Sequence, residues 1–148
     1  MNAAGIDVSK GKSMVSVMRP LGEVVAKPFT VCHTGSELKE LADYLKSLDG
    51  ETRVIMEHTG RYYEPVAQFL HDAGLYVSAV NPKLIKDYGN NSLRKVKTDK
   101  ADSKKIAKYG LDNWGELRQY ASMDTIRYQL KTLSGLSLRY RFRQLYRC

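Results

Sequence analysis

The sequence has few cysteines and no long hydrophobic run. Cys32 and Cys148 are its two cysteines, too few for a disulfide framework or a cysteine zinc site, and we expect both to be plain thiols. No apolar stretch is long enough to cross a bilayer, and residues 1–4 lack the pattern of a signal peptide. These absences argue against a disulfide-stabilised secreted domain and a membrane protein, and they predict a cytoplasmic protein.

Acidic residues are also in short supply. The 148 residues include 24 lysines and arginines but 16 aspartates and glutamates, which gives a formal net charge of +8. Such an excess favours a polyanionic partner, and nucleic acid is the commonest one. Hydrophobic residues make up 43% of the chain, enough for the core of one domain of ordinary size. We therefore expect one compact domain with an appendage.

The stretch GIDVSKGKS at residues 5–13 allows two interpretations. A P-loop has four residues between its first glycine and Gly-Lys-Ser, whereas five separate Gly5 from Gly11. A P-loop also runs into a helix, but residues 14–18 alternate in polarity as a half-buried strand does. The stretch therefore indicates a strand that carries Asp7. A carboxylate there costs desolvation energy unless it is paired or metal-bound.

The hydrophobic pattern predicts an α/β domain. Its five strands are expected at residues 4–9, 13–19, 23–31, 53–57 and 75–80. Its three helices are expected at residues 34–50, 62–73 and from 99 to between 110 and 114. Thr34 and Glu37 have the spacing of a capping box, and no element is predicted between residues 83 and 96. This order is that of the ribonuclease H-like fold, a mixed five-stranded sheet flanked by helices.

Four acidic residues fall where this fold brings strand ends together at one edge of the sheet. Asp7 lies at the centre of the first predicted strand, and Glu57 ends the fourth. Asp99 and Asp102 begin the last helix three residues apart, so that both face the same way. The alternative for these two is that they are N-terminal helix acids favoured by the helix dipole.

Four carboxylates that converge on one point repel one another unless cations lie among them. Hard oxygen ligands suit Mg²⁺ or Mn²⁺. Two such ions about 4 Å apart would activate an attacking oxygen and stabilise a leaving one in phosphodiester displacement. The predicted chemistry is therefore that of a nuclease or strand transferase. Its metal ligands and catalytic residues are Asp7, Glu57, Asp99 and Asp102.

Basic residues surround the last two acids. The predicted nucleic-acid-binding residues are Lys83, Lys86, Arg94, Lys95, Lys97, Lys100 and Lys104. They would hold phosphates near the metals, and the alternative is a solvated basic surface. A second stretch, from residue 127 to 147, interleaves arginine with tyrosine and phenylalanine. Its aromatic side chains either stack on bases or pack on a partner helix, and we favour packing on another protomer.

Three segments resemble the amino-terminal domain of the IS110-family transposases over about residues 4–114. They are GIDVSK, VIMEHTGRYYEPVAQFLHDAGLYVSAVNP and KTDKADSKKIA. The resemblance implies that Asp7, Glu57, Asp99 and Asp102 form the family's Asp-Glu-Asp-Asp signature, which is similar to that of RuvC Holliday-junction resolvases. It also implies site-specific DNA recombination of a mobile element, and in some members guidance by a structured RNA of that element.

The sequence departs from the family in two places. Family members continue through a helical, coiled-coil-like region into a carboxy-terminal domain with a proposed serine nucleophile, whereas this chain stops at Cys148. We expect a catalytic domain at residues 1–115 and the start of a helical extension at 116–148, which would form a homo-oligomer, with the serine-containing domain absent. His58 stands where the family commonly has a small residue. Adjacent strand residues face opposite ways, so we do not expect His58 and Glu57 to bind one metal.

Two other classes fit parts of the sequence. A nucleic-acid-binding module that does not cleave would keep the fold and the charge. An actin-like ATPase half also begins with a Gly-Ile-Asp strand, but it needs a second nucleotide-binding domain for which the chain has no room. The main prediction is a RuvC-like transposase domain with DNA as partner and Mg²⁺ or Mn²⁺ as cofactor.

Overall fold

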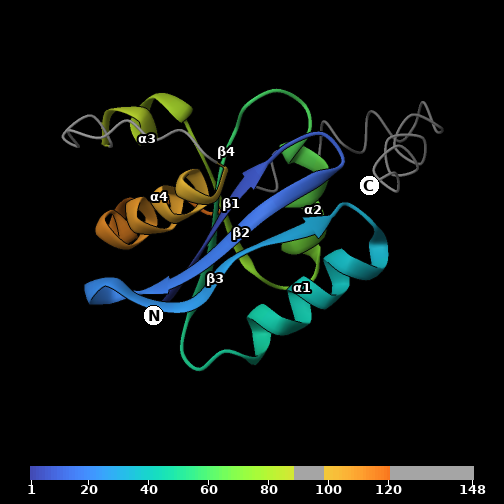
Figure 1. Ribbon diagram of the computed structural model, residues 1–148, viewed down its shortest axis with the longest axis horizontal. Coiled ribbons are helices and arrows are strands. Elements are labelled where there is room, and N and C mark those ends of the chain that lie inside the picture. Colours follow the sequence, from blue (N-terminus) through green and yellow to red (C-terminus); the bar gives the residue numbers. More distant parts are fainter. Residues whose placement is uncertain (89–98, 121–148) are drawn as a thin grey trace.

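The chain forms a five-stranded sheet with helices on both faces (Figure 1). A computed structural model describes residues 1–88 and 99–120, with the backbone alone for residues 99–101. The strands are β1 (Asn2–Val8), β2 (Lys12–Arg19), β3 (Glu23–Cys32), β4 (Thr52–Glu57) and β5 (Tyr76–Val80). The helices are α1 (Gly35–Ser47), α2 (Tyr63–Asp72), α3 (Pro82–Tyr88) and α4 (Asp99–Asp112), with short 3₁₀ turns at Pro20–Gly22 and Trp114–Glu116.

The sheet has the strand order β3-β2-β1-β4-β5. β1, β2 and β3 form an antiparallel meander, whereas β4 and β5 run parallel to β1. The two crossover connections, through α1 and α2, lie on one face of the sheet, and α4 lies on the other (Figure 1). These observations confirm the predicted mixed five-stranded sheet. No helix in the described ranges is long and apolar enough to span a membrane.

α1 forms where the sequence predicts it. The Thr34 side chain accepts a hydrogen bond from the Glu37 backbone N–H at 3.2 Å, which satisfies one of the free donors at the helix start. The predicted apolar stripe is buried against the sheet and consists of Leu38, Leu41, Ala42 and Leu45. The helix ends at Ser47 rather than at Gly50, which instead has a φ of 85° in the turn before β4.

The alternation of side chains along β1 divides the core into two layers. Ala4 and Ile6 face α1 and α2, in the larger hydrophobic cluster. Ala3 belongs to the smaller cluster, which contains Ile106 and Ala107 of α4. Because successive strand residues point to opposite faces, the odd-numbered residues of β1 lie beneath α4.

α4 packs directly on the backbone of β1. A Cβ atom at Gly5 would lie 2.2 Å from the carbonyl oxygen of Ser103 and 2.5 Å from the backbone nitrogen of Ala107. Beside this contact, the buried hydroxyls of Ser16 and Ser103 are hydrogen-bonded at 2.7 Å. One turn further along, a Cβ at Gly110 would lie 2.5 Å from Cδ1 of Ile55. Small residues on both elements therefore set the position of α4.

α3 lies in a segment for which no element was predicted, so that prediction is wrong for residues 83–88. The Asn81 side chain accepts a hydrogen bond from the Lys83 backbone N–H at 2.9 Å, and Pro82 occupies the first helical position, which it favours. Ile85 is the buried residue of this helix. A short helix with one buried side chain shows no hydrophobic period. The predicted loop at residues 89–92 lies outside the described residues.

Two predictions about single residues are also wrong. Asp7 is the next-to-last residue of β1 rather than its centre. The strand begins at Asn2, two residues before the predicted start, and ends at Val8, one residue before the predicted end. Cys32 is disulfide-bonded rather than a plain thiol. The spacing of cysteines in a sequence does not reveal which of them the fold brings together, and Cys148 lies outside the described residues.

After α4 the chain passes along β5, at the edge of the sheet. The Tyr76 hydroxyl donates to the carbonyl oxygen of Leu117 at 3.0 Å, and the Tyr120 backbone N–H donates to that of Val77. The Tyr120 ring is buried and lies edge-on against His71 of α2, with a centroid distance of 6.0 Å. The predicted helical extension and its oligomer fall mostly on residues 121–148, outside the described part, and the domain division at 115 stays a prediction.

Gly5→Ala tests the close packing of α4. The added methyl group overlaps the backbone of α4, so we expect the free energy of unfolding to fall by roughly 1–3 kcal/mol. Gly115→Ala is the control, because a Cβ there meets nothing within 4 Å. Urea unfolding of both variants measures the difference, and equal stability of the two would contradict the packing described above.

Candidate active site

Asp7 and Glu57 come to the same edge and the same face of the sheet. β1 pairs with β4 in a constant register from Asn2 opposite Thr52 to Ile6 opposite Met56. Each pair differs by 50 positions, and one further step sets Asp7 level with Glu57. Both lie on the face that α4 covers, because their odd-numbered neighbours Gly5 and Ile55 contact α4. Both carboxylates are half-buried.

α4 brings Asp102 to this edge. Asp102 is half-buried and directly precedes Ser103, whose backbone lies over Gly5. Burial is the main reason why the pKa of Glu57 is raised, and the negative charge of Asp102 raises it further. The ammonium of Lys105 acts in the opposite direction on the same pKa. The charges of Glu57, Asp102 and Lys105 therefore interact at the carboxyl end of β4.

The fourth predicted acid is described only by its backbone. Asp99 is the first residue of α4, one turn before Asp102, and its side chain lies outside the described part. Within the described ranges, no three or more histidine, cysteine, aspartate or glutamate side chains are grouped so as to hold a metal ion. The structure thus brings Glu57 and Asp102 together with Asp7 level on the neighbouring strand, and the four-carboxylate site stays a prediction.

His58 follows Glu57 in the sequence, but its side chain contacts a different helix. Its backbone N–H donates to the carbonyl oxygen of Val80 at 2.9 Å. Its exposed ring is tilted against Tyr63 of α2, with centroids 6.3 Å apart, whereas Glu57 lies on the face of α4. The expectation that the two side chains do not share a metal stays a prediction.

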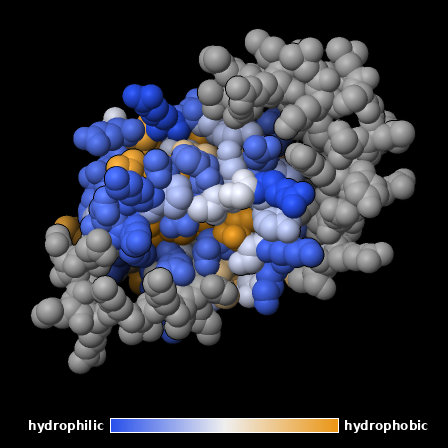
Figure 2. Space-filling model, turned by 90° about the horizontal axis from the view of Figure 1, so that it is seen from above, coloured by the Kyte–Doolittle hydropathy of each residue, from blue (hydrophilic) through white to orange (hydrophobic). Residues whose placement is uncertain are grey.

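The basic residues are only partly described. Lys83 and Lys86 of α3 and Lys104 of α4 are exposed. The other predicted phosphate contacts, Arg94, Lys95, Lys97 and the side chain of Lys100, lie outside the described part. α3 begins just after β5, which ends at the same sheet edge as β1 and β4. Figure 2 shows the molecule from above, turned by 90° from Figure 1. On this face the described surface is mainly hydrophilic, with small scattered hydrophobic areas.

α3 and α4 are held together by two tyrosines. The rings of Tyr88 and Tyr109 meet edge to face with centroids 5.7 Å apart, and the Tyr88 hydroxyl donates to the Asp112 carboxylate. Burial, together with this hydrogen bond and the Asp112 charge, raises the pKa of Tyr88 to about 12. The hydroxyl therefore remains protonated, and a donor, even above the ordinary tyrosine pKa of about 10. The lysines of α3 are in this way fixed next to α4.

Arg53 fixes the segment that follows α4. Its guanidinium lies between the rings of Tyr76 and Trp114, 4.3 Å and 4.4 Å from their centroids. It also donates to the carbonyl oxygen of Trp114 at 2.7 Å. A cation between two aromatic faces is favourable, more so when it is shielded from water. α4 is therefore held near its middle, at Ser103 and Ala107, by the contact with Gly5, and just beyond its end by Arg53.

Sequence reasoning did not single out Lys105 as a site residue. It was one of many lysines around the last acids. The available signal was its spacing, because a residue three positions after Asp102 lies close to it on a helix surface. No local sequence pattern predicts the hydrogen bond between Ser16 and Ser103, because the two serines are 87 positions apart.

Comparisons with known proteins agree with this geometry. A family model for the Asp-Glu-Asp-Asp transposases of the IS110 type, described as Transposase, matches residues 4–141. Thermus thermophilus RuvC in complex with a Holliday junction substrate is similar in structure, with a TM-score of 0.54 and 15% identity over 80% of this chain and 99% of that chain. A second structure of Thermus thermophilus RuvC has a TM-score of 0.55 and 17% identity over the same shares. No curated protein matches. The predicted RuvC-like fold is confirmed.

Asp102→Asn tests the interaction between the two carboxylates. Removal of the Asp102 charge takes away one cause of the raised pKa of Glu57, so that this pKa should fall toward its ordinary value while burial keeps part of the shift. A side-chain carboxyl titration by NMR measures it, with Asp43→Asn on the far face as the control. An unchanged pKa of Glu57 would show that the two side chains do not interact.

The same shift predicts a dependence of stability on pH. A raised pKa means that folded Glu57 binds its proton more tightly than unfolded Glu57 does. Its contribution to stability is full below the unfolded pKa and is lost as pH rises through the folded pKa. In metal-free buffer, the free energy of unfolding of the Glu57→Gln variant should therefore fall less than that of the wild type as pH rises through this window. Parallel curves for the two proteins would contradict the shift.

Proposed function

Because the chain belongs to the IS110 family of transposases, we propose that it is a catalytic domain that cleaves and transfers DNA strands. The observation that carries the proposal is the interaction of Glu57 with Asp102 across β4 and α4, level with Asp7 of β1. The fold supports it, since the similar RuvC structure is bound to a Holliday junction. DNA is the proposed partner of this chain.

We propose that the carboxylates hold a divalent cation. Oxygen atoms of Asp7, Glu57 and Asp102 would hold Mg²⁺ or Mn²⁺, with Asp99 as the fourth ligand, because these ions prefer hard oxygen donors. The raised pKa of Glu57 supports this assignment, since a cation would relieve the repulsion by Asp102. When bound, such ions activate an attacking oxygen and stabilise a leaving one in phosphodiester displacement.

The chain's own contribution is to hold these groups in place. Asp7 and Glu57 lie on paired strands, and Asp102 lies on a helix in direct contact with Gly5. Each ligand is thus on a rigid element, which favours a site of defined geometry. Lys105, whose charge acts on Glu57, would limit the repulsion among the acids and attract a phosphate to the edge.

The exposed lysines of α3 and α4 would hold the nucleic acid. Lys83, Lys86 and Lys104 are exposed, and we propose that they form one phosphate-binding surface with Arg94, Lys95, Lys97 and Lys100. Contacts to phosphates set position but do not read sequence. Such contacts also do not distinguish DNA from RNA. Guidance by a structured RNA and assembly of a homo-oligomer through residues 116–148 are two further proposals.

A second candidate function is nucleic-acid binding without cleavage. It is favoured by one observation, that the described residues do not group three metal-binding side chains. It predicts binding without metal-dependent nicking. The metal-binding and cleavage experiments below separate the two functions, and the salt-dependence experiment tests the binding surface that both require.

Metal binding is the first experiment. Mn²⁺ should bind to the wild type and raise its melting temperature, because a ligand of the folded state stabilises it. Asp7→Ala should weaken the binding at least about tenfold, since it removes a ligand from a site of few ligands. Isothermal titration calorimetry measures the affinity, and Asp43→Asn, an exposed acid of α1, is the control. Equal affinities of Asp7→Ala and the wild type would remove Asp7 from the site.

Phosphate contacts are tested by salt dependence. Lys83→Ala with Lys86→Ala should weaken the binding of every DNA sequence and flatten the plot of log affinity against log salt by roughly one unit per lost contact. Fluorescence anisotropy with a four-way junction and a plain duplex measures both. Lys39→Ala with Lys46→Ala, exposed on α1, is the matched control, and the same slope in both double variants would make α3 a solvated surface.

Cleavage separates the two functions. Asp102→Asn should leave DNA binding intact or tighten it, because a negative charge is lost. It should nevertheless abolish Mn²⁺-dependent nicking, which depends on stabilisation of the transition state. Recombination of a DNA substrate is assayed with the wild type and with the Asp102→Asn variant. Recombination that survives this substitution would show that Asp102 is not catalytic.

A further inference from the structure

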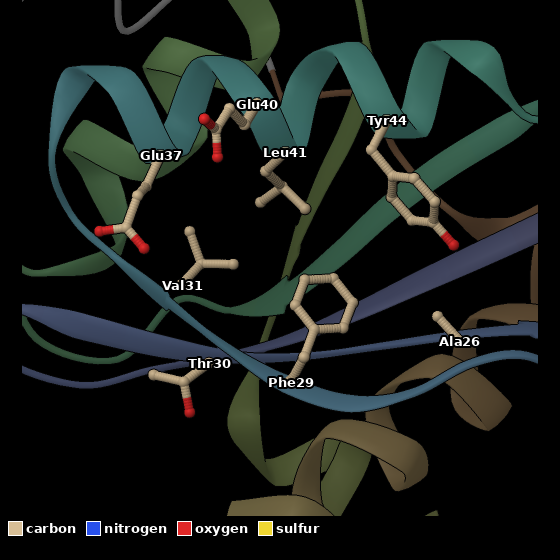
Figure 3. Close-up of a pocket in the computed structure, with 8 residues that line it drawn as sticks. All are labelled: Ala26, Phe29, Thr30, Val31, Glu37, Glu40, Leu41 and Tyr44. Atoms are coloured by element: carbon tan, nitrogen blue, oxygen red, sulfur yellow. The ribbon is translucent and has the colours of Figure 1, made fainter.

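A groove lies between α1 and the edge strand β3, on the face of the sheet opposite α4. Its volume is about 380 Å³. Phe29 and Val31 line it from β3, and Leu41 and Tyr44 line it from α1 (Figure 3). The rings of Phe29 and Tyr44 meet edge to face with centroids 6.3 Å apart. The groove therefore offers apolar and aromatic surface that residues 1–88 and 99–120 leave unfilled.

Two carboxylates stand on the α1 side of this groove. Glu37 is half-buried and belongs to the capping box with Thr34, whereas Glu40 is exposed. Figure 3 shows both on the same helix as Leu41 and Tyr44, along one side of the groove. Two negative charges repel phosphates, so the groove does not suit nucleic acid. Its chemistry suits a segment with aromatic side chains and positive charge.

The occupant is not an added β-strand. β3 is an edge strand, but Pro28 at its middle has no backbone N–H to donate, and the neighbouring Lys27 is exposed. Proline and lysine are residues that protect an edge from further pairing. The groove is thus suited to side chains presented by a helix or an irregular segment.

The chain itself contains a segment of this chemistry. Residues 139–147 read RYRFRQLYR and carry four arginines, two tyrosines and one phenylalanine. We propose that this segment of the same chain docks in the groove, with its aromatic side chains against Phe29 and Tyr44 and its arginines beside Glu37 and Glu40. Aromatic rings and arginine are the residues that most often dominate such contacts. The inference is independent of the proposed function.

The length of the intervening chain permits this contact. Tyr120 is buried on the same face of the sheet as the groove, near β5. β5 and β3 are four strand spacings apart, or roughly 20 Å. The eighteen residues 121–138 span about 27 Å as a helix and about 60 Å when extended. The segment therefore reaches the groove in either conformation.

Limited trypsin digestion of the full chain tests the docking, because docked arginines are protected from cleavage. Mass spectrometry follows the cuts after Arg139 and Arg143, with reductant present so that the disulfide of Cys32 does not contribute. Glu40→Lys should speed these cuts roughly two- to fivefold, the effect of one exposed ion pair. Asp43→Lys, an exposed acid of the same helix outside the groove, should leave the rate unchanged.

A charge exchange completes the test. Arg141→Glu alone should also speed cleavage after Arg139 and Arg143, whereas Arg141→Glu combined with Glu40→Lys should return the rate toward that of the wild type. Equal rates in Glu40→Lys, Asp43→Lys and the wild type would overturn the proposal, as would additive effects in the combined variant. Protection that falls on dilution would also overturn it, because the occupant would then be a second copy.

Discussion

The site depends on the contact between α4 and the backbone of β1. A helix approaches a strand this closely only where no side chain intervenes, and Gly5 supplies that gap beneath Ser103 and Ala107. Asp7 lies two residues after Gly5 on the strand, and Asp102 lies one residue before Ser103 on the helix. The same contact therefore fixes the positions of both acids relative to each other. The packing of the core and the placement of the proposed ligands are therefore one constraint.

The carboxylates at this edge of the sheet repel one another. Burial raises the pKa of Glu57 and Asp102 raises it further, while Lys105 lowers it. Such a group of like charges lowers stability unless it binds a cation, and this is a common reason why perturbed pKa values occur at functional sites. The Arg53 guanidinium lies over the rings of Tyr76 and Trp114 and holds the chain just beyond α4.

Local signals predicted most of the fold, and contacts between distant segments were the part that they missed. The capping box at Thr34 and the apolar stripe of α1 involve residues within one or two turns, so the sequence pattern contains them. α3 was missed because one buried residue, Ile85, makes no period. The acids Asp7, Glu57 and Asp102 were predicted from their places in the expected strands and helix, and the resemblance to a family signature agreed with that prediction, whereas Lys105 became distinct only when the fold set it near Glu57.

An anomalous difference map from crystals soaked in Mn²⁺ would locate the metal relative to the three carboxylates. We expect a Mn²⁺ peak at the carboxyl ends of β1 and β4, within coordination distance of carboxylate oxygens of Asp7, Glu57 and Asp102, with α4 in contact with Gly5. A map in which Mn²⁺ binds elsewhere, while these three carboxylates stay apart with no metal between them, would contradict it.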